Sequence, residues 1–350
     1  MNKRIAVVGA GAVGGYIGGF LAHGGHNVTL IDPWPEHVET VRAHGMELFG
    51  MSDAERVTVR VPIIHLTELQ GVVRQQPFDI AIVSTKSYDT AWAATMIAQY
   101  LSPDGYVVSA QNCINEPCIA SIVGWGKTVG CVVGGGIGVE LFQPGHIRRG
   151  YAKTGLPGSL IVGEVHGRVT DRIRELAEIL SSVDAVTTTT NLWGERWSKL
   201  CVNGMRNAVS AATGLYGNAR DQNDASRLVG IKLGGESVRV GQALGYDFDH
   251  VDNLDAELLA KASEGDRPAL DKIEAEMLGA TKTTKRSNLQ RPSMAQDIAK
   301  GRRTEIEQIN GYIARCATEI GITAPTHAMI TSLVKRIECG EITADPKNLL

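Results

Sequence analysis

Close to the N-terminus, three glycines (Gly9, Gly11 and Gly14) follow a short apolar run and precede a segment with helical periodicity. The run Arg4–Val8 is apolar and rich in β-branched residues, as in a strand buried on both faces. A strand that turns through Gly-x-Gly-x-x-Gly into a helix is typical of a parallel sheet, because the helix must pack back over the strand. The chain is therefore expected to begin with a Rossmann-type domain.

The same turn has the geometry that a dinucleotide requires. Gly9 permits the tight turn, Gly11 lets the backbone approach a pyrophosphate, and Gly14 lets the helix pack closely on the strand. The helix N-terminus then faces the anion. A glycine-rich turn without a ligand is the alternative, and the strand before it and the helix after it argue against this. The expected cofactor-binding residues here are Gly9, Ala10, Gly11, Ala12, Val13 and Gly14.

An acidic residue follows the second expected strand, Asn27–Ile31. Asp32 lies 18 residues after Gly14, near the spacing at which a carboxylate accepts hydrogen bonds from the adenosine ribose. A carboxylate there repels the 2′-phosphate of NADP, so NAD is expected as cofactor and NADP is less suited, unless His37 or Arg42 compensates. FAD could use a similar fingerprint, but the C-terminal half has no second dinucleotide-like segment.

The first half of the chain alternates short β-branched runs with helical patterns, which predicts a doubly wound parallel sheet. A glycine-rich stretch, Val139–Val162, is expected to form antiparallel strands. Further strands are expected at Arg4–Val8, Asn27–Ile31, Ile80–Ser84, Tyr106–Ala110, Thr128–Val133 and Ala185–Thr190. Helices are expected at Ala12–His23, Glu36–His44, Thr90–Tyr100, Glu116–Val123 and Arg168–Ser182.

After Asn191 the strand pattern stops and helical periodicity continues to the end. Helices are expected at Leu192–Ala211, Ala225–Leu244, Asp255–Lys261, Ala269–Leu278 and Thr304–Ile320. The predicted fold class is α/β, with an N-terminal Rossmann-type doubly wound sheet and an all-helical C-terminal domain. We expect residues 1–190 to form the NAD(P)-binding domain and residues 191–350 to form a substrate and dimerisation domain.

Composition excludes several classes of function. The chain is 43% hydrophobic and 21% charged with a formal net charge of −3, so no nucleic-acid partner is expected. No apolar run approaches the roughly 20 residues of a membrane span, so no membrane partner is expected. Six scattered cysteines lack Cys-x-x-Cys spacing, which argues against a metal site or a disulfide framework and favours the cytoplasm.

Polar residues follow two further strands at the edge where doubly wound folds bind ligands. Lys86 follows the third strand and can reach a phosphate or a ribose, and Asn112 follows the fourth and can bond the nicotinamide ribose. The alternatives are a solvated lysine and a turn-forming asparagine.

The first helix of the second half carries a nitrogen-rich stripe. Lys199, Asn203 and Asn207 are spaced by four, so a helix places them on one face. Such a face suits an oxyanion or a carboxylate. A solvated polar face is the alternative.

Taken together, these motifs resemble the ketopantoate reductase (2-dehydropantoate 2-reductase) family over nearly the whole chain. The resemblance rests on the glycine turn, the Lys86 and Asn112 strand ends, the Trp197-x-Lys199-x-x-x-Asn203-x-x-x-Asn207 helix, Pro292-Ser293-Met294-x-Gln296-Asp297-Ile298, Gly301-Arg-x-Thr304-Glu305-Ile306, Asn310-Gly311 and Gly321-Ile-Thr-Ala-Pro325.

This resemblance implies hydride transfer from a nicotinamide to the C2 ketone of a 2-oxo acid. It further implies that Lys199 is the general acid and that Ser293, Asn203 and Asn207 hold the substrate carboxylate and hydroxyl. Glu305 would orient the lysine or the substrate hydroxyl beside the cofactor. A plain carboxylate at the start of a helix is the alternative for Glu305.

In three places the chain departs from the family pattern. Asp32-Pro33 stands where many members have an arginine, Cys113 replaces the glycine after the family asparagine, and residues 250–291 look longer than usual. Two rivals therefore remain: a dehydrogenase of another hydroxy acid in a catabolic pathway, and a regulator that binds NAD(H) without catalysis. A homodimer formed through the helical domain is expected.

Overall fold

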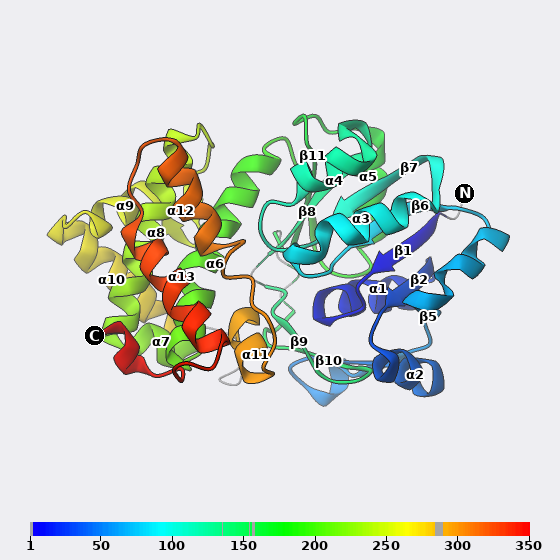
Figure 1. Ribbon diagram of the computed structural model, residues 1–350, viewed down its shortest axis with the longest axis horizontal. Helices are drawn as coiled ribbons and strands as arrows, with labels where there is room; N and C mark the ends of the chain where they lie inside the picture. The colour runs from blue at the N-terminus through cyan, green and yellow to red at the C-terminus, as the bar shows by residue number, and fades with distance from the viewer. Residues whose placement is uncertain (1–2, 135, 154, 156–157, 284–289) are drawn as a thin grey trace. The chain divides into compact units, whose positions relative to one another are not determined.

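The computed structural model describes residues 3–134, 136–153, 155, 158–283 and 290–350 (Figure 1). The chain divides into two compact units, Met1–Leu192 and Trp193–Leu350. Within the described ranges, no helix combines the length and the apolar character needed to cross a membrane.

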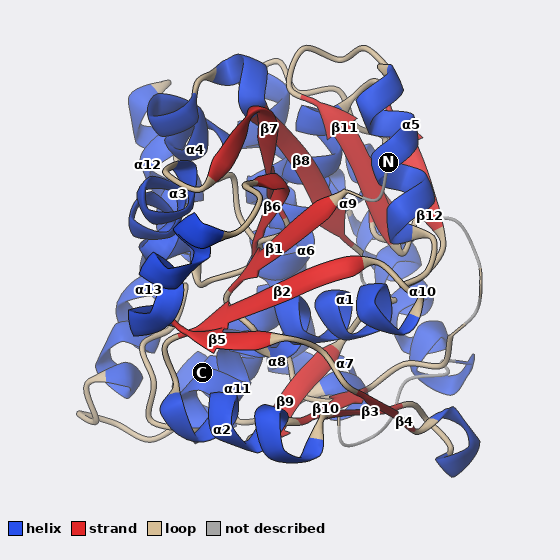
Figure 2. Cartoon of the chain, turned by 90° about the vertical axis from the view of Figure 1, so that its right-hand side faces the viewer, coloured by secondary structure: helices blue, strands red, loops and turns tan. Residues whose placement is uncertain are grey.

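The first unit is built on an eight-stranded sheet with the order β12-β11-β8-β7-β6-β1-β2-β5 (Figure 2). Six neighbouring strands, from β8 to β5 in that order, run parallel, whereas β11 pairs antiparallel with β8 and parallel with β12. The strands are β1 (Arg4–Val8), β2 (Asn27–Asp32), β5 (Ile63–His65), β6 (Phe78–Val83), β7 (Leu101–Ser109), β8 (Thr128–Val133), β11 (Leu160–Glu164) and β12 (Val186–Thr189).

Helices cover both faces of this sheet, as predicted for a doubly wound fold. Alternate residues of β1 explain why: Ile5 and Val7 join the core that contains residues of α1 and α5, whereas Ala6 and Val8 join the core that contains residues of α3 and α4. The helices are α1 (Ala12–His23), α2 (Pro35–His44), α3 (Thr90–Ala98), α4 (Glu116–Val123) and α5 (Asp171–Leu180).

A second, four-stranded sheet with the order β4-β3-β10-β9 belongs to the same unit. Its strands are β3 (Met46–Phe49), β4 (Val57–Val59), β9 (Val139–Gln143) and β10 (His146–Arg149). The antiparallel pairing of β9 and β10 agrees with the prediction for residues 139–162, but strands β3, β4 and β5 were not predicted. Three- and four-residue strands are too short to leave a clear period in the sequence.

The second unit is largely helical, as predicted. It contains α6 (Leu192–Thr213), α7 (Gly217–Gln222), α8 (Asp224–Ala243), α9 (Ala256–Ser263), α10 (Arg267–Thr283), α11 (Ser293–Ala299), α12 (Asn310–Glu319) and α13 (Pro325–Glu338). A hairpin of two-residue strands, β13 (His250–Val251) and β14 (Leu254–Asp255), interrupts the helices. The hairpin, α7, α11 and α13 were not predicted from the sequence.

The expected helix Thr304–Ile320 is wrong at its start, because α12 begins only at Asn310. Thr304 donates hydrogen bonds from its backbone N (2.9 Å) and its Oγ1 (2.6 Å) to the Glu338 carboxylate on α13. These two hydrogen bonds to a distant residue hold Thr304 outside a helix, and residues 305–309 form a bend and turns, although the apolar spacing of the segment is helical. Glu305 consequently does not sit at the start of a helix.

Candidate functional site

In the first unit, four parallel strands end in one row. The registers pair Val8 with both Ile31 and Val83, and Val83 with Ser109. The residues that directly follow β1, β6 and β7, together with Asp32 at the end of β2, therefore lie along the same edge of the sheet. This edge is where open α/β sheets bind their ligands.

The glycine turn at this edge is closely packed at Gly14 and open at Gly11. Gly9 has a φ of +89°, a conformation that favours glycine. A Cβ at Gly14 would lie 2.0 Å from the Gly9 carbonyl oxygen and 2.1 Å from Ser84 Oγ, so helix α1 needs glycine there. A Cβ at Gly11 would meet nothing within 4 Å.

Helix α1 begins directly after Gly11, and no described side chain caps its N-terminus. Ala12 and Val13 are half-buried, whereas Ala10 is buried beneath the turn. The first N–H groups of a helix lack intrahelical acceptors, so this end can bind an anion such as a pyrophosphate. The turn thus fits a dinucleotide.

Asp32 braces the glycine turn. Its Oδ2 accepts a hydrogen bond from Ala10 N (2.7 Å) and its Oδ1 accepts one from Trp34 N (2.9 Å). The side chain is buried, but each carboxylate oxygen can accept a second hydrogen bond. A negative charge is therefore fixed beside the turn, where the sequence predicted the adenosine ribose.

Both residues named as compensating cations have other partners in this structure. His37 is buried, which lowers its pKa, and its ring bonds the Ala10 carbonyl oxygen (3.0 Å) and accepts from Gly145 N (2.9 Å). Arg42 donates to the Ile63 carbonyl oxygen (3.1 Å) and pairs with Glu39 and Glu68. The charge of Asp32 is not balanced by these side chains.

The loops that carry Lys86 and Asn112 are joined to each other. Ser87 Oγ donates to the Asn112 carbonyl oxygen (3.2 Å), and Gln111 Nε2 donates to the Thr85 carbonyl oxygen (2.9 Å). Lys86 and Asn112 themselves are half-buried. Gln111 was not among the residues predicted from the sequence, and its place directly before Asn112 at a strand end was the available signal.

In the second unit, helix α6 carries the predicted stripe. Asn203 is buried, and Lys199 and Asn207 are half-buried. Asn207 Nδ2 lies 3.5 Å from Ser293 Oγ, at the start of α11. The structure thus brings together Asn207 and Ser293, which lie 86 residues apart in the sequence.

The electrostatics of Lys199 suit a proton donor. Burial lowers its pKa to about 8, Asp252 opposes this shift, and Arg206 adds to it. Within the described part of the chain, its ammonium group makes no hydrogen bond and no ion pair. Proton transfer is most effective when the pKa of the donor lies near the operating pH.

Two residues that influence Lys199 were missed from the sequence. Arg206 lies seven residues after Lys199, so it is on the same side of α6, and its Nη1 donates to Asp252 Oδ2 (2.7 Å). Asp252 lies between the two strands of the β13–β14 hairpin, and Ser198 Oγ joins α6 to this hairpin by donating to the His250 carbonyl oxygen (2.6 Å). The spacing could have identified Arg206, but nothing local could have identified Asp252.

Glu305 lies in the turn before α12 and is buried. Its carbonyl oxygen accepts hydrogen bonds from Gln308 N (3.1 Å) and Ile309 N (3.0 Å), so the turn is rigid. A buried carboxylate in a rigid turn can orient a neighbouring donor.

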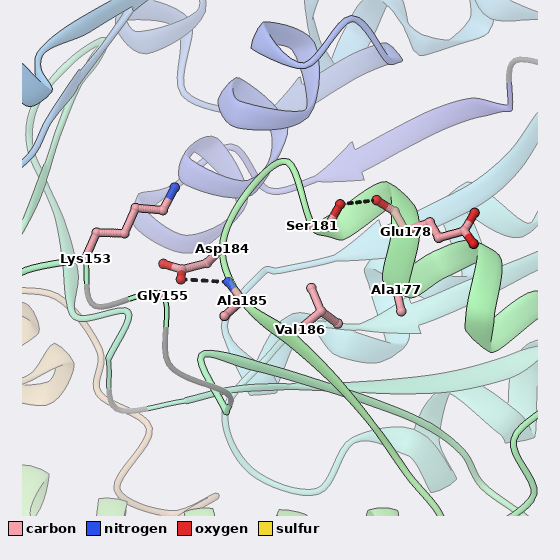
Figure 3. Close-up of a pocket in the computed structure, with 8 residues that line it drawn as sticks. All are labelled: Lys153, Gly155, Ala177, Glu178, Ser181, Asp184, Ala185 and Val186. Atoms are coloured by element: carbon pink, nitrogen blue, oxygen red, sulfur yellow. Dashed lines mark hydrogen bonds between the residues drawn. The ribbon is translucent and has the colours of Figure 1, made fainter.

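The first unit also has a cavity of about 520 Å³ between α5, the start of β12 and Lys153 (Figure 3). It contains none of the predicted site residues. Two of its polar groups bond nearby backbone atoms: Ser181 Oγ bonds the Glu178 carbonyl oxygen (2.6 Å), and Asp184 Oδ1 bonds Ala185 N (2.8 Å). The Asp184 carboxylate also pairs with the buried Arg149, so its contacts are those of a structural ion pair.

Comparison with known proteins identifies the relatives of the chain. Residues 5–167 match the model of the ketopantoate reductase PanE/ApbA family, and residues 191–338 match the model of its C-terminal domain. The 2-dehydropantoate 2-reductase of Pyrococcus abyssi is 29% identical over 343 residues, which are 97% of this chain and 99% of the relative.

Solved structures agree. The PanE/ApbA family ketopantoate reductase from Ralstonia eutropha JMP134 has a TM-score of 0.75 at 28% identity and covers 97% of this chain and 99% of its own. D-mandelate dehydrogenase, solved with NADH and anilino(oxo)acetate, has a TM-score of 0.77 at 23% identity. The match covers 96% of this chain and 99% of the dehydrogenase. A dimeric ketopantoate reductase from Staphylococcus aureus has a TM-score of 0.67 at 20% identity. The match covers 97% of this chain and 100% of that reductase.

The last two likenesses show the fold alone, whereas the two family models together span both units. With the glycine turn and the polar stripe of α6 in place, the chain belongs to the ketopantoate reductase PanE/ApbA family and is a ketopantoate reductase-like oxidoreductase.

Proposed function

We propose that the protein reduces the C2 ketone of a small 2-oxo acid to a 2-hydroxy acid with a nicotinamide dinucleotide, and that 2-dehydropantoate is the first substrate to test. The observation that carries this proposal is the polar face of α6. It combines an ammonium group that makes no hydrogen bond within the described chain with the Asn207–Ser293 pair.

The nicotinamide would supply the hydride that adds to C2. The proposed role of Lys199 is to donate a proton from its Nζ to the ketone oxygen, which becomes the hydroxyl, while the amine keeps the electron pair of the broken N–H bond. Before that step, the ammonium charge stabilises the negative charge that develops on the oxygen.

The neighbouring polar groups are proposed to hold the substrate. The Asn207 amide and the Ser293 hydroxyl, 3.5 Å apart, can both donate to one carboxylate. Asn203, one helical turn after Lys199, can bond the substrate oxygen, and Glu305 can orient the lysine or the product hydroxyl. Such contacts accelerate the reaction by fixing the orientation of the ketone.

On the cofactor side, we propose that the N-terminus of α1 binds the pyrophosphate, that Lys86 and Asn112 contact phosphate or ribose, and that NADH is preferred over NADPH. Support for this preference comes from the buried Asp32 carboxylate and from His37 and Arg42, which are engaged elsewhere. The 2′-phosphate of NADPH would meet an unbalanced like charge.

The buried Asp32 carboxylate also favours a second candidate function. An NAD preference fits the oxidation of a hydroxy acid, in which the neutral Lys199 amine accepts the hydroxyl proton. We therefore keep an NAD-dependent dehydrogenase of another hydroxy acid as the alternative.

The test follows nicotinamide absorbance with NADH and with NADPH against a panel of 2-oxo acids, and with NAD against the matching hydroxy acids. Lys199→Ala should abolish most turnover but retain cofactor binding, and Lys232→Ala, which alters an exposed lysine on α8, should change neither. If the protein binds NAD(H) but turns over no acid in either direction, it is a regulator and the proposal fails.

We further infer a homodimer, supported by the dimeric relative and by the exposed Leu228, Leu244 and Met329 of the second unit. Light scattering at several concentrations tests this inference. Six free cysteines favour a reducing compartment such as the cytoplasm.

A further inference from the structure

A buried polar network lies behind the stripe of α6, and the chemistry proposed above does not use it. Asn310, the first residue of α12, donates from its Nδ2 to the Gly204 carbonyl oxygen on α6 (3.0 Å) and approaches His327 Nδ1 on α13 (3.2 Å). On its other side, His327 Nε2 lies 2.9 Å from Ser237 Oγ on α8. Asn310, His327 and Ser237 are fully buried.

The hydrogen bonds determine which atoms donate. His327 Nε2 also lies 2.9 Å from the Leu233 carbonyl oxygen, which can only accept, so Nε2 carries the proton. Burial lowers the pKa of His327 to about 4, so the ring is neutral near pH 7 and Nδ1 accepts from Asn310. Both N–H groups of the Asn310 amide are thus used, and a flipped amide would place its oxygen against two acceptors.

The network reaches α6 because residue 204 has no side chain. A Cβ at Gly204 would lie 3.2 Å from His327 Cε1 and 3.6 Å from Asn310 Nδ2. Glycine inside a helix is destabilising relative to alanine, so this position needs a packing reason. Gly204 directly follows Asn203, so the contact lies on the back of α6 beside a residue of the proposed substrate-binding face.

Asn310 is also joined to the turn that carries Glu305. The backbone bonds Ile309 N to Glu305 O (3.0 Å) and Gly311 N to Ile306 O (2.9 Å) run through this segment without a break. Before the turn, Thr304 is bonded to Glu338. Helix α13 therefore holds the turn from both sides, at Glu338 and, through Asn310, at His327.

We propose that Asn310 is a positioning residue. Through its bond to Gly204, it holds the Glu305 turn in a fixed position relative to the Lys199–Asn207 face of α6. His327 keeps the Asn310 amide in the required orientation. Asn310 lies behind the helix and acts through Glu305, Asn203 and Lys199. The kinetic test of this role rests on the proposed function, whereas the hydrogen-exchange test does not.

Variants of three residues distinguish the effect of losing the Asn310–Gly204 bond from a general loss of stability. Asn310→Asp keeps the shape but removes both donors, so kcat should fall about 10- to 100-fold with little change in KM or cofactor affinity. Ser237→Ala removes a bond from the same network on the α8 side and should keep kcat within about twofold. His327→Asn retains an acceptor near the position of Nδ1 and should keep most of the kcat that His327→Leu loses.

Hydrogen exchange gives a readout that does not depend on activity. Asn310→Asp should speed exchange of the Gln308 and Ile309 amides and of the Ala208 amide of α6, whereas Ser237→Ala should leave these amides protected. Equal kcat for the Asn310 and Ser237 variants, or unchanged exchange at residues 308–309, overturns the proposal. If the wild-type protein turns over no 2-oxo or hydroxy acid, the proposed function fails, and hydrogen exchange still decides whether Asn310 couples the turn to α6.

Discussion

The rate of 2-oxo acid reduction should fall as pH rises through about 8, because the proposed proton donor is then lost. Lys199 ordinarily has a pKa of 10.5, and burial lowers this pKa to about 8. Below that pH the ammonium group is intact and kcat/KM is flat. Above it, kcat/KM should drop about tenfold per pH unit, so the loss is about tenfold near pH 9 and about a hundredfold near pH 10.

Oxidation of the corresponding hydroxy acid requires the neutral amine. Its rate should therefore rise with pH and level off above about pH 8, the mirror image of the reductive profile. The assay measures initial rates from nicotinamide absorbance in both directions, in buffers of constant ionic strength. Lys199→Arg should remove the inflection, because a guanidinium stays protonated across this range.

The carboxylate of Asp252 offers a sharper test. It raises the pKa of Lys199, so Asp252→Asn should move the inflection to lower pH. Asp271→Asn, which alters an exposed carboxylate on α10, should leave the inflection in place. An inflection near the ordinary lysine value, or one that Asp252→Asn does not move, would refute the assignment of Lys199 as the proton donor.

Three further predictions concern the first unit. Asp32→Asn removes the charge but keeps an oxygen for Ala10 N, so the kcat/KM ratio of NADPH to NADH should rise by on the order of tenfold or more; an unchanged ratio would place the 2′-phosphate away from Asp32. Cys113 has a φ of +68°, so Cys113→Gly should change the free energy of unfolding by less than about 1 kcal/mol and Cys113→Val should destabilise by about 1–2 kcal/mol or more; equal stability in urea would contradict this. Gly14→Ala should lose dinucleotide affinity, measured by calorimetry, because its Cβ would lie 2.0 Å from the Gly9 carbonyl oxygen. Gly11→Ala should still fold, because a Cβ there would meet nothing within 4 Å.

Much of the fold could be predicted because its signals are local. Strands β1 and β8 and helices α1 and α4 have the predicted bounds, since each is a continuous apolar run or a full helical period between glycine turns. The stripe of α6 was found for the same reason, because residues four apart on a helix share a face. The strands β3, β4 and β5 are too short to carry such a period.

Other features depend on residues far away in the sequence. The helix expected from Thr304 begins at Asn310 because a carboxylate 34 residues later holds Thr304. The influence of Asp252 on Lys199 depends on a hairpin, which the helical pattern around it did not reveal.

Local sequence accounts for the glycine turn, the buried strands and the order of polar residues on α6, because helix and strand periods are set by neighbours along the chain. Three contacts depend on the folded chain: Asp32 bonds the glycine turn, Ser293 lies beside Asn207, and Asn310 bonds Gly204, 106 residues away. Hydrogen-bond partners across such separations are chosen by packing, and no local pattern encodes them.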